Sequence, residues 1–163
     1  MNQLERGILF ATTVHSGQKD KSGYTYILHP LAVMCMVQAQ YAGQEQDIPD
    51  GVTLEELLLG AVLHDTVEDC EVSLDEIETR FGLVVRNLVD ALTRREGEKY
   101  FDFVRRTLLN PAAVIIKRAD IAHNMSRTAN LPPSEQGMIH RYEKALKILH
   151  GELKGDLWKK KKN

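Results

Sequence analysis

Cysteine is scarce in this chain, with only Cys35 and Cys70 among its 163 residues. Two thiols without framework spacing exclude a disulfide-stapled scaffold and favour a reducing compartment, so we expect a cytoplasmic protein. No apolar run is long enough to cross a bilayer and no signal-peptide pattern is found, so no membrane partner is expected. An excess of one charge is also lacking, because the formal net charge is -2. This excludes non-specific nucleic-acid binding by the whole body, and a phosphate-bearing ligand would need locally placed cations.

The composition is that of an ordinary folded domain. Hydrophobic residues make up 43% of the chain and charged residues 27%, which argues against disorder. The length suits a single domain over residues 1–163 with one adequate core. A basic tail over about residues 155–163, which includes Lys159 and Lys162, is expected to be a solvated terminus. The sequence carries no signal for an oligomeric state.

The hydrophobic pattern is helical nearly throughout, with no sustained strand alternation. Leu4, Ile8, Ala11 and Val14 recur at helical spacing in the first segment. First turns are marked by Pro30, by the capping boxes Thr53 with Glu56 and Ser73 with Glu76, and by Pro111 after Asn110. A last amphipathic helix is expected over residues 139–153. We therefore predict an all-α fold, an irregular helical bundle of roughly seven or eight helices with short loops.

The dipeptide His64-Asp65 closes an apolar run over residues 57–63 that is typical of a buried helix. Two ionisable groups at the foot of a core helix cost several kcal/mol to desolvate unless something pairs with them. Imidazole beside carboxylate is a mixed nitrogen and oxygen donor set, which favours a divalent metal. The ordinary alternative is a helix end, where a histidine complements the dipole and the aspartate begins the exit loop.

Two more acids follow one helical turn later. Glu68 lies four residues after His64, and Asp69 lies four residues after Asp65. Three acids within five residues repel one another, so a nearby cation would stabilise them. A solvated acidic loop is the alternative interpretation.

Three isolated polar signals, His29, Asp120 and Asn124, could complete a metal site. His29 is bracketed by apolar neighbours, and Asp120 follows an apolar run over residues 112–116. His123 and Asn124 come within one turn of Asp120. Taken singly, His29 could be a hydrogen-bonded core histidine and Asp120 an ordinary salt-bridged aspartate.

Three motifs in order resemble a known family: YILHP at residues 26–30, LHDTVED at residues 63–69 and ADIAHNM at residues 119–125. The chain resembles the HD superfamily of metal phosphohydrolases. More closely, it is similar to the hydrolase domain of RelA/SpoT proteins and to stand-alone small alarmone hydrolases, which remove the 3′-pyrophosphate from ppGpp and pppGpp. The resemblance implies an all-helical, HD-domain-like fold and a small phosphorylated nucleotide as substrate, with GDP or GTP and pyrophosphate as products.

The resemblance also assigns roles to single residues. It implies that the metal ligands are His29, His64, Asp65 and Asp120, with manganese as the usual ion. The donor set itself also suits another divalent transition metal. Glu68 and Asp69 would orient and deprotonate the attacking water. Asn124 would contact the nucleotide, and Lys21 lies in the loop that approaches the phosphates.

One departure concerns the substrate. The family loop after residues 15–18 (HSGQ) usually contains an arginine, and Asp20 stands at that position, between Lys19 and Lys21. An acid there is expected to repel a pyrophosphate, and the bidentate grip of an arginine is lost. An HD phosphohydrolase for another nucleotide or phosphate ester therefore stays an alternative, as does a non-catalytic nucleotide-binding module.

Overall fold

The computed structural model of the chain describes residues 1–127 and 136–151. Within these residues the secondary structure is helical, and the one extended pairing is an isolated bridge between Lys19 and Thr25. The helices are α1 (Gln3–Val14), α2 (Leu28–Tyr41), a 3-10 turn (Glu45–Asp47), α3 (Leu54–Leu63), α4 (Thr66–Asp69), α5 (Leu74–Phe81), α6 (Leu83–Leu92), α7 (Tyr100–Thr107), α8 (Pro111–Ser126) and α9 (Gln136–Leu149). This confirms the all-α prediction. The predicted basic tail and the end of the last predicted helix lie outside the described residues.

Local signals explain where several helices begin. The Thr53 hydroxyl accepts from the backbone N–H of Glu56 at 3.2 Å, and the Glu56 carboxylate accepts from the N–H of Thr53 at 2.8 Å, so the predicted capping box is complete. Ser73 also accepts from the backbone of Glu76, but the Glu76 carboxylate accepts from Arg80 instead. These caps fix the starts of α3 and α5.

Two predicted starts shift by a few residues. The helix expected to open at Pro30 begins at Leu28, because the carbonyls of Thr25 and Tyr26 already accept from the next turn. Pro30 still lies in the first turn, where its missing N–H breaks no helical bond. The consequence is that His29 lies inside α2 rather than in the loop before it. The last helix likewise begins at Gln136, ahead of residue 139.

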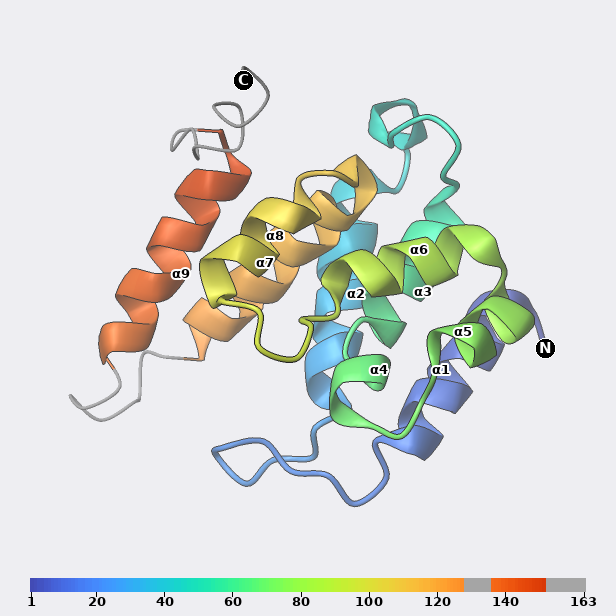
Figure 1. Ribbon diagram of the computed structural model, residues 1–163. Coiled ribbons are helices and arrows are strands. Elements are labelled where there is room, and N and C mark those ends of the chain that lie inside the picture. The colour runs from blue at the N-terminus through green and yellow to red at the C-terminus, as the bar shows by residue number, and fades with distance from the viewer. Residues whose placement is uncertain (128–135, 152–163) are drawn as a thin grey trace.

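Helix α3 forms the centre of the main core. Residues 57–63 of α3 are all buried, and the helix packs against α1, α2, α6 and α8 (Figure 1). Fully burying a leucine contributes about 1.5–3 kcal/mol. Gly60 lets α3 approach closely, since a Cβ at this position would lie 2.9 Å from side-chain carbons of both Ile116 and Leu88. α3 is therefore held tightly between α6 and α8.

A second core cluster joins α7, α8 and α9, and includes Val104, Ile121 and Ile148. Glu98 and Arg106 tie the start of this cluster to α6. Arg106 donates to both carboxylate oxygens of Glu98 at 2.8 Å and to the carbonyl of Thr93 at 2.8 Å. The hydrogen bond from Arg106 lowers the pKa of Glu98 to about 2. No helix in the described parts of the chain combines the length and the apolarity that a membrane crossing needs.

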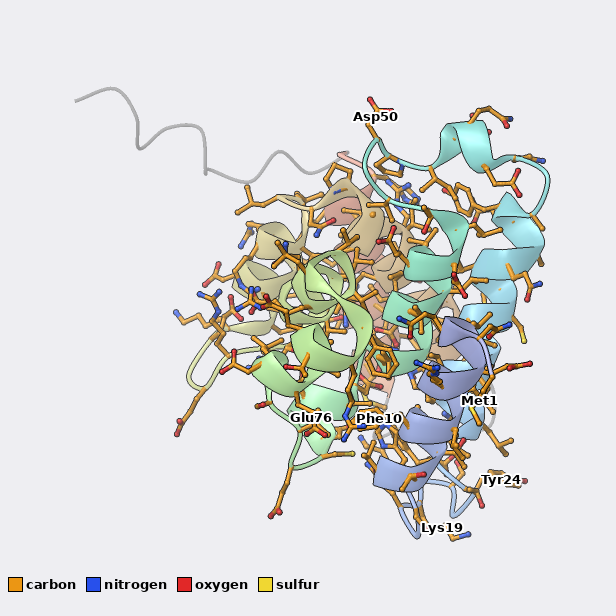
Figure 2. All side chains as sticks on the ribbon, turned by 90° about the vertical axis from the view of Figure 1, so that its right-hand side faces the viewer. Met1, Phe10, Lys19, Tyr24, Asp50 and Glu76 are labelled. Carbon is orange, nitrogen blue, oxygen red and sulfur yellow. The ribbon has the colours of Figure 1, made fainter. Side chains whose placement is uncertain are left out.

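The lower end of the bundle in Figure 1 brings distant segments together: the start of α2, the junction of α3 with α4, and the end of α8. The loop between α1 and α2 lies at the same end. Figure 2, turned by 90°, shows Lys19 and Tyr24 of this loop at the lower edge of the molecule. These segments carry the four predicted metal ligands, His29, His64, Asp65 and Asp120.

Candidate active site

The four predicted metal ligands meet in one corner. His29 comes from the first turn of α2, His64 and Asp65 from the end of α3, and Asp120 from α8. The Nε2 atom of His29 lies 3.2 Å from Oδ1 of Asp120 and 3.6 Å from Oδ2 of Asp65. Nε2 of His64 lies 3.0 Å from Oδ2 of Asp65 and 3.9 Å from Oδ1 of Asp120. One ligand atom each from His29, His64 and Asp120 fall within 4.8 Å of one another.

His64 is oriented like a metal ligand. Its Nδ1 lies 2.8 Å from the carbonyl oxygen of Ala61, which can only accept, so Nδ1 carries a hydrogen, and the neutral ring has its lone pair on Nε2. The residue is 1% exposed, and among the described residues Nε2 has no hydrogen-bond partner. A buried lone pair beside carboxylate oxygens is unfavourable unless a positive charge lies between them. The corner therefore fits a divalent cation.

The electrostatics of the corner agree with this. Burial lowers the pKa of His64, but the carboxylates of Asp65 and Asp120 outweigh it and raise that pKa to about 9. Burial raises the pKa of Asp65, but the nearby His64 outweighs burial and lowers that pKa below its usual range. The raised pKa of His64 and the lowered pKa of Asp65 both indicate that a positive charge is favoured between these side chains.

Asp120 is held by its own helix. Its Oδ2 lies 2.8 Å from Nζ of Lys117, and its Oδ1 accepts from the amide of Asn124 at 2.6 Å. Burial raises the pKa of Asp120, but Lys117 and the histidines bring it far below its usual range. Asn124, predicted to contact the nucleotide, thus contacts a predicted metal ligand and also lines the cavity described below.

Tyr26 and His123 each contact one of the predicted ligands, and neither was assigned a role from the sequence. The Tyr26 hydroxyl donates to Oδ2 of Asp65 at 2.7 Å, and burial together with Asp65 raises the pKa of this tyrosine. The Nδ1 atom of His123 lies 2.8 Å from Nδ1 of His29. Burial lowers the pKa of His123, as does the neighbouring His29.

Glu68 and Asp69 lie on the one-turn helix α4, which the sequence did not predict as a separate element. Both line the cavity that is also lined by His29, Asp65 and Asp120. Partial burial raises the pKa of both carboxyls, and Glu68 also accepts from the backbone N–H of Arg94 at 2.7 Å. The two acids are thus close to the corner without belonging to the group of three ligand atoms.

The corner opens into a cavity of about 420 Å³, a size typical of small-molecule sites. Cationic side chains gather on its wall: Lys19, Lys21, Lys117, Arg94, Arg127 and Arg141. Tyr100, Phe103 and Tyr142 add aromatic surface. The carboxylates of the metal corner and these cations line the same cavity. Since lysine and arginine pair well with phosphate oxygens, this arrangement suits a ligand that carries phosphates. The sequence did not single out Arg94 or Arg127, since neither belongs to a motif.

The structure gives Asp20 partners that the sequence did not predict. Oδ1 of Asp20 accepts from the backbone N–H groups of Ser22 at 2.8 Å and Tyr24 at 3.0 Å, and Oδ2 pairs with Arg127. Although burial raises the pKa of Asp20, these hydrogen bonds and Arg127 lower it overall. The acid organises the loop and is compensated by a cation 107 residues away, which the sequence could not reveal.

Comparison with known proteins agrees with the fold. The HD domain family matches residues 8–146. A GTP pyrophosphokinase of Streptomyces coelicolor is 35% identical over 83% of this chain and 16% of its own length. A probable guanosine-3′,5′-bis(diphosphate) 3′-pyrophosphohydrolase of Synechocystis is 33% identical over 85% of this chain and 18% of its own length. The chain thus spans less than a fifth of either relative.

A solved structure shows the same fold. It is named as a metazoan ortholog of SpoT that hydrolyses ppGpp, and it superposes with a TM-score of 0.71 at 22% identity. The match covers 91% of this chain and 85% of the other. The family match extends over all four predicted metal ligands and both acids of α4. With this coverage, and with an all-helical fold that gathers these residues in one corner, the chain belongs to the HD domain family.

Proposed function

We propose that this chain hydrolyses the 3′-pyrophosphate of ppGpp and pppGpp, releasing GDP or GTP and pyrophosphate. The observation that carries the proposal is the convergence of His29, His64, Asp65 and Asp120 at the wall of a cavity rich in cations. The names of the two curated relatives point to the same class of nucleotide. We further propose that the described helices form one domain and that the protein is cytoplasmic.

His29, His64, Asp65 and Asp120 would hold the divalent ion, with manganese as the first choice. Such an ion, when bound, lowers the pKa of water and neutralises charge on phosphoryl oxygens. Lys21 and the cavity arginines would bind the phosphates, because both residue types pair well with phosphate oxygens. Asn124 would contact the nucleotide from the same wall.

Product identification tests this function. With Mn²⁺ and ppGpp, the purified protein should release pyrophosphate and GDP in equal amounts, and a chelator should stop the reaction. Release of orthophosphate, or turnover only of other nucleotides, would instead indicate another HD phosphohydrolase. A nucleotide-induced rise in Tm with no turnover under any tested metal would indicate a binding module.

Glu68 and Asp69 are proposed to orient and deprotonate the attacking water. Their raised pKa values suit proton acceptance nearer neutral pH than an ordinary carboxyl allows. Glu68→Gln and Asp69→Asn should each lower kcat, and the residue acting as general base should lose about 10²–10⁴-fold. The Kd for Mn²⁺ should change little in both variants. Glu71→Gln, an exposed acid two residues later, is the matched control. Wild-type kcat in both variants would refute the assignment.

A further inference from the structure

His29 has one ring nitrogen directed to the metal corner and the other to His123. Its Nε2 lies 3.2 Å from Asp120 and 3.6 Å from Asp65, so Nε2 is the atom that faces a cation. A neutral imidazole coordinates through its unprotonated nitrogen, and the hydrogen then lies on the other one. For His29 this places the hydrogen on Nδ1.

The partner of that hydrogen is another imidazole. Nδ1 of His29 and Nδ1 of His123 are 2.8 Å apart, which is a hydrogen-bond distance. Two ring nitrogens can form this bond only if one carries the hydrogen and the other a lone pair. Because His29 must donate, His123 must accept at Nδ1 and carry its own hydrogen on Nε2.

We propose that His123 is a positioning residue, which fixes the tautomer and the ring orientation of His29 for metal binding. This inference rests on the proposed function, and it assigns a role to a residue that is neither a proposed metal ligand nor a proposed catalytic acid. Partners of this kind orient metal-bound histidines in many proteins, and losing one typically weakens metal affinity about 10–100-fold.

The two histidine ligands are supported in different ways. Nδ1 of His64 binds the backbone carbonyl of Ala61, which no substitution of a side chain can remove. His29 instead depends on a side chain 94 residues away. The His29 and His123 rings also pack together, with centroids 4.9 Å apart and planes inclined by 32°. Since His123 follows Asp120 on α8, one helix both supplies a ligand and orients another.

The test compares three substitutions by isothermal titration with Mn²⁺. His123→Ala removes the acceptor and should raise the Kd by about 10–100-fold. His123→Asn places an amide oxygen near the former Nδ1 and should stay within about threefold of the wild type. His123→Gln, which carries its amide one carbon further out, should resemble the alanine variant. His140→Ala, at an exposed histidine of α9, is the control for losing an imidazole. Thermal unfolding in a chelator verifies that each variant is folded.

A second readout observes the hydrogen bond itself. Long-range ¹H–¹⁵N NMR of the metal-free protein should show a hydrogen on one of the two Nδ1 atoms of His29 and His123. With diamagnetic Zn²⁺ bound, that hydrogen should lie on Nδ1 of His29, and His123 should be protonated at Nε2. An unprotonated Nδ1 on His29 in the Zn²⁺ form, or an alanine variant that binds Mn²⁺ as tightly as the wild type, would overturn the inference. A wild type that binds no Mn²⁺ would overturn the proposed metal chemistry, while the NMR result would still decide the hydrogen bond separately.

Discussion

Asp65→Ala should lower ppGpp hydrolysis by about a thousandfold or more, comparable to the loss of a key charge-stabilising group. The carboxylate touches the Nε2 atoms of both His29 and His64, so its loss removes one proposed ligand and weakens the attraction for the cation. The fold should survive, because the side chain is partly exposed at the cavity wall and not part of the apolar core. Initial rates with Mn²⁺ and thermal unfolding in a chelator measure the two effects.

Two further variants make this result specific. Asp75→Ala removes an exposed aspartate from the first turn of α5 and should leave the rate unchanged. Tyr26→Phe keeps the ring but removes the hydroxyl that donates to Asp65, so a smaller loss of rate is expected. Asp65→Ala with wild-type turnover would exclude Asp65 from the reaction.

Asp120→Ala should give the largest loss of stability among single substitutions in the site. Asp120 is the acid bound to Lys117, whose side chain is 11% exposed. Removing one partner of a buried ion pair costs about 3–5 kcal/mol, because the other charge stays buried without compensation. Urea unfolding in a chelator measures this cost without a contribution from metal binding.

A double-mutant cycle separates the ion pair from other effects of Asp120. Lys117→Met removes the buried cation, and the combined variant leaves neither charge unpaired. Asp120→Ala and Lys117→Met should therefore destabilise less together than the sum of the two alone, by about 0.5–3 kcal/mol. Strict additivity would show that the contact at 2.8 Å contributes nothing to folding.

Local signals predicted most of the fold. The reciprocal cap of Thr53 and Glu56 and the Asn110-Pro111 break each act within one turn, so the sequence alone was sufficient to place α3 and α8. The start of α2 was predicted two residues too late, because proline is tolerated anywhere in the first turn of a helix. The helix α4 was missed because four residues are too few for a periodic pattern.

The candidate site was predictable where residue type and sequence context were sufficient. His64 and Asp65 stood out as ionisable groups at the end of an apolar run, and the family motifs added His29 and Asp120. The supporting contacts were not predictable in this way. Asp20 meets Arg127 and His29 meets His123 across 107 and 94 residues, so these pairs depend on how α2, α8 and the first loop pack.

Gly60 lies one helical turn before His64 and affects how far His64 lies from Asp120. The helix that ends at His64 lies against Ile116 of α8, with no room for a single methyl group at position 60. Four residues further along each helix, the same two backbones present His64 and Asp120, whose facing atoms are 3.9 Å apart. The separation of His64 and Asp120 therefore depends on the close approach of α3 to α8 at Gly60, a residue that does not line the cavity.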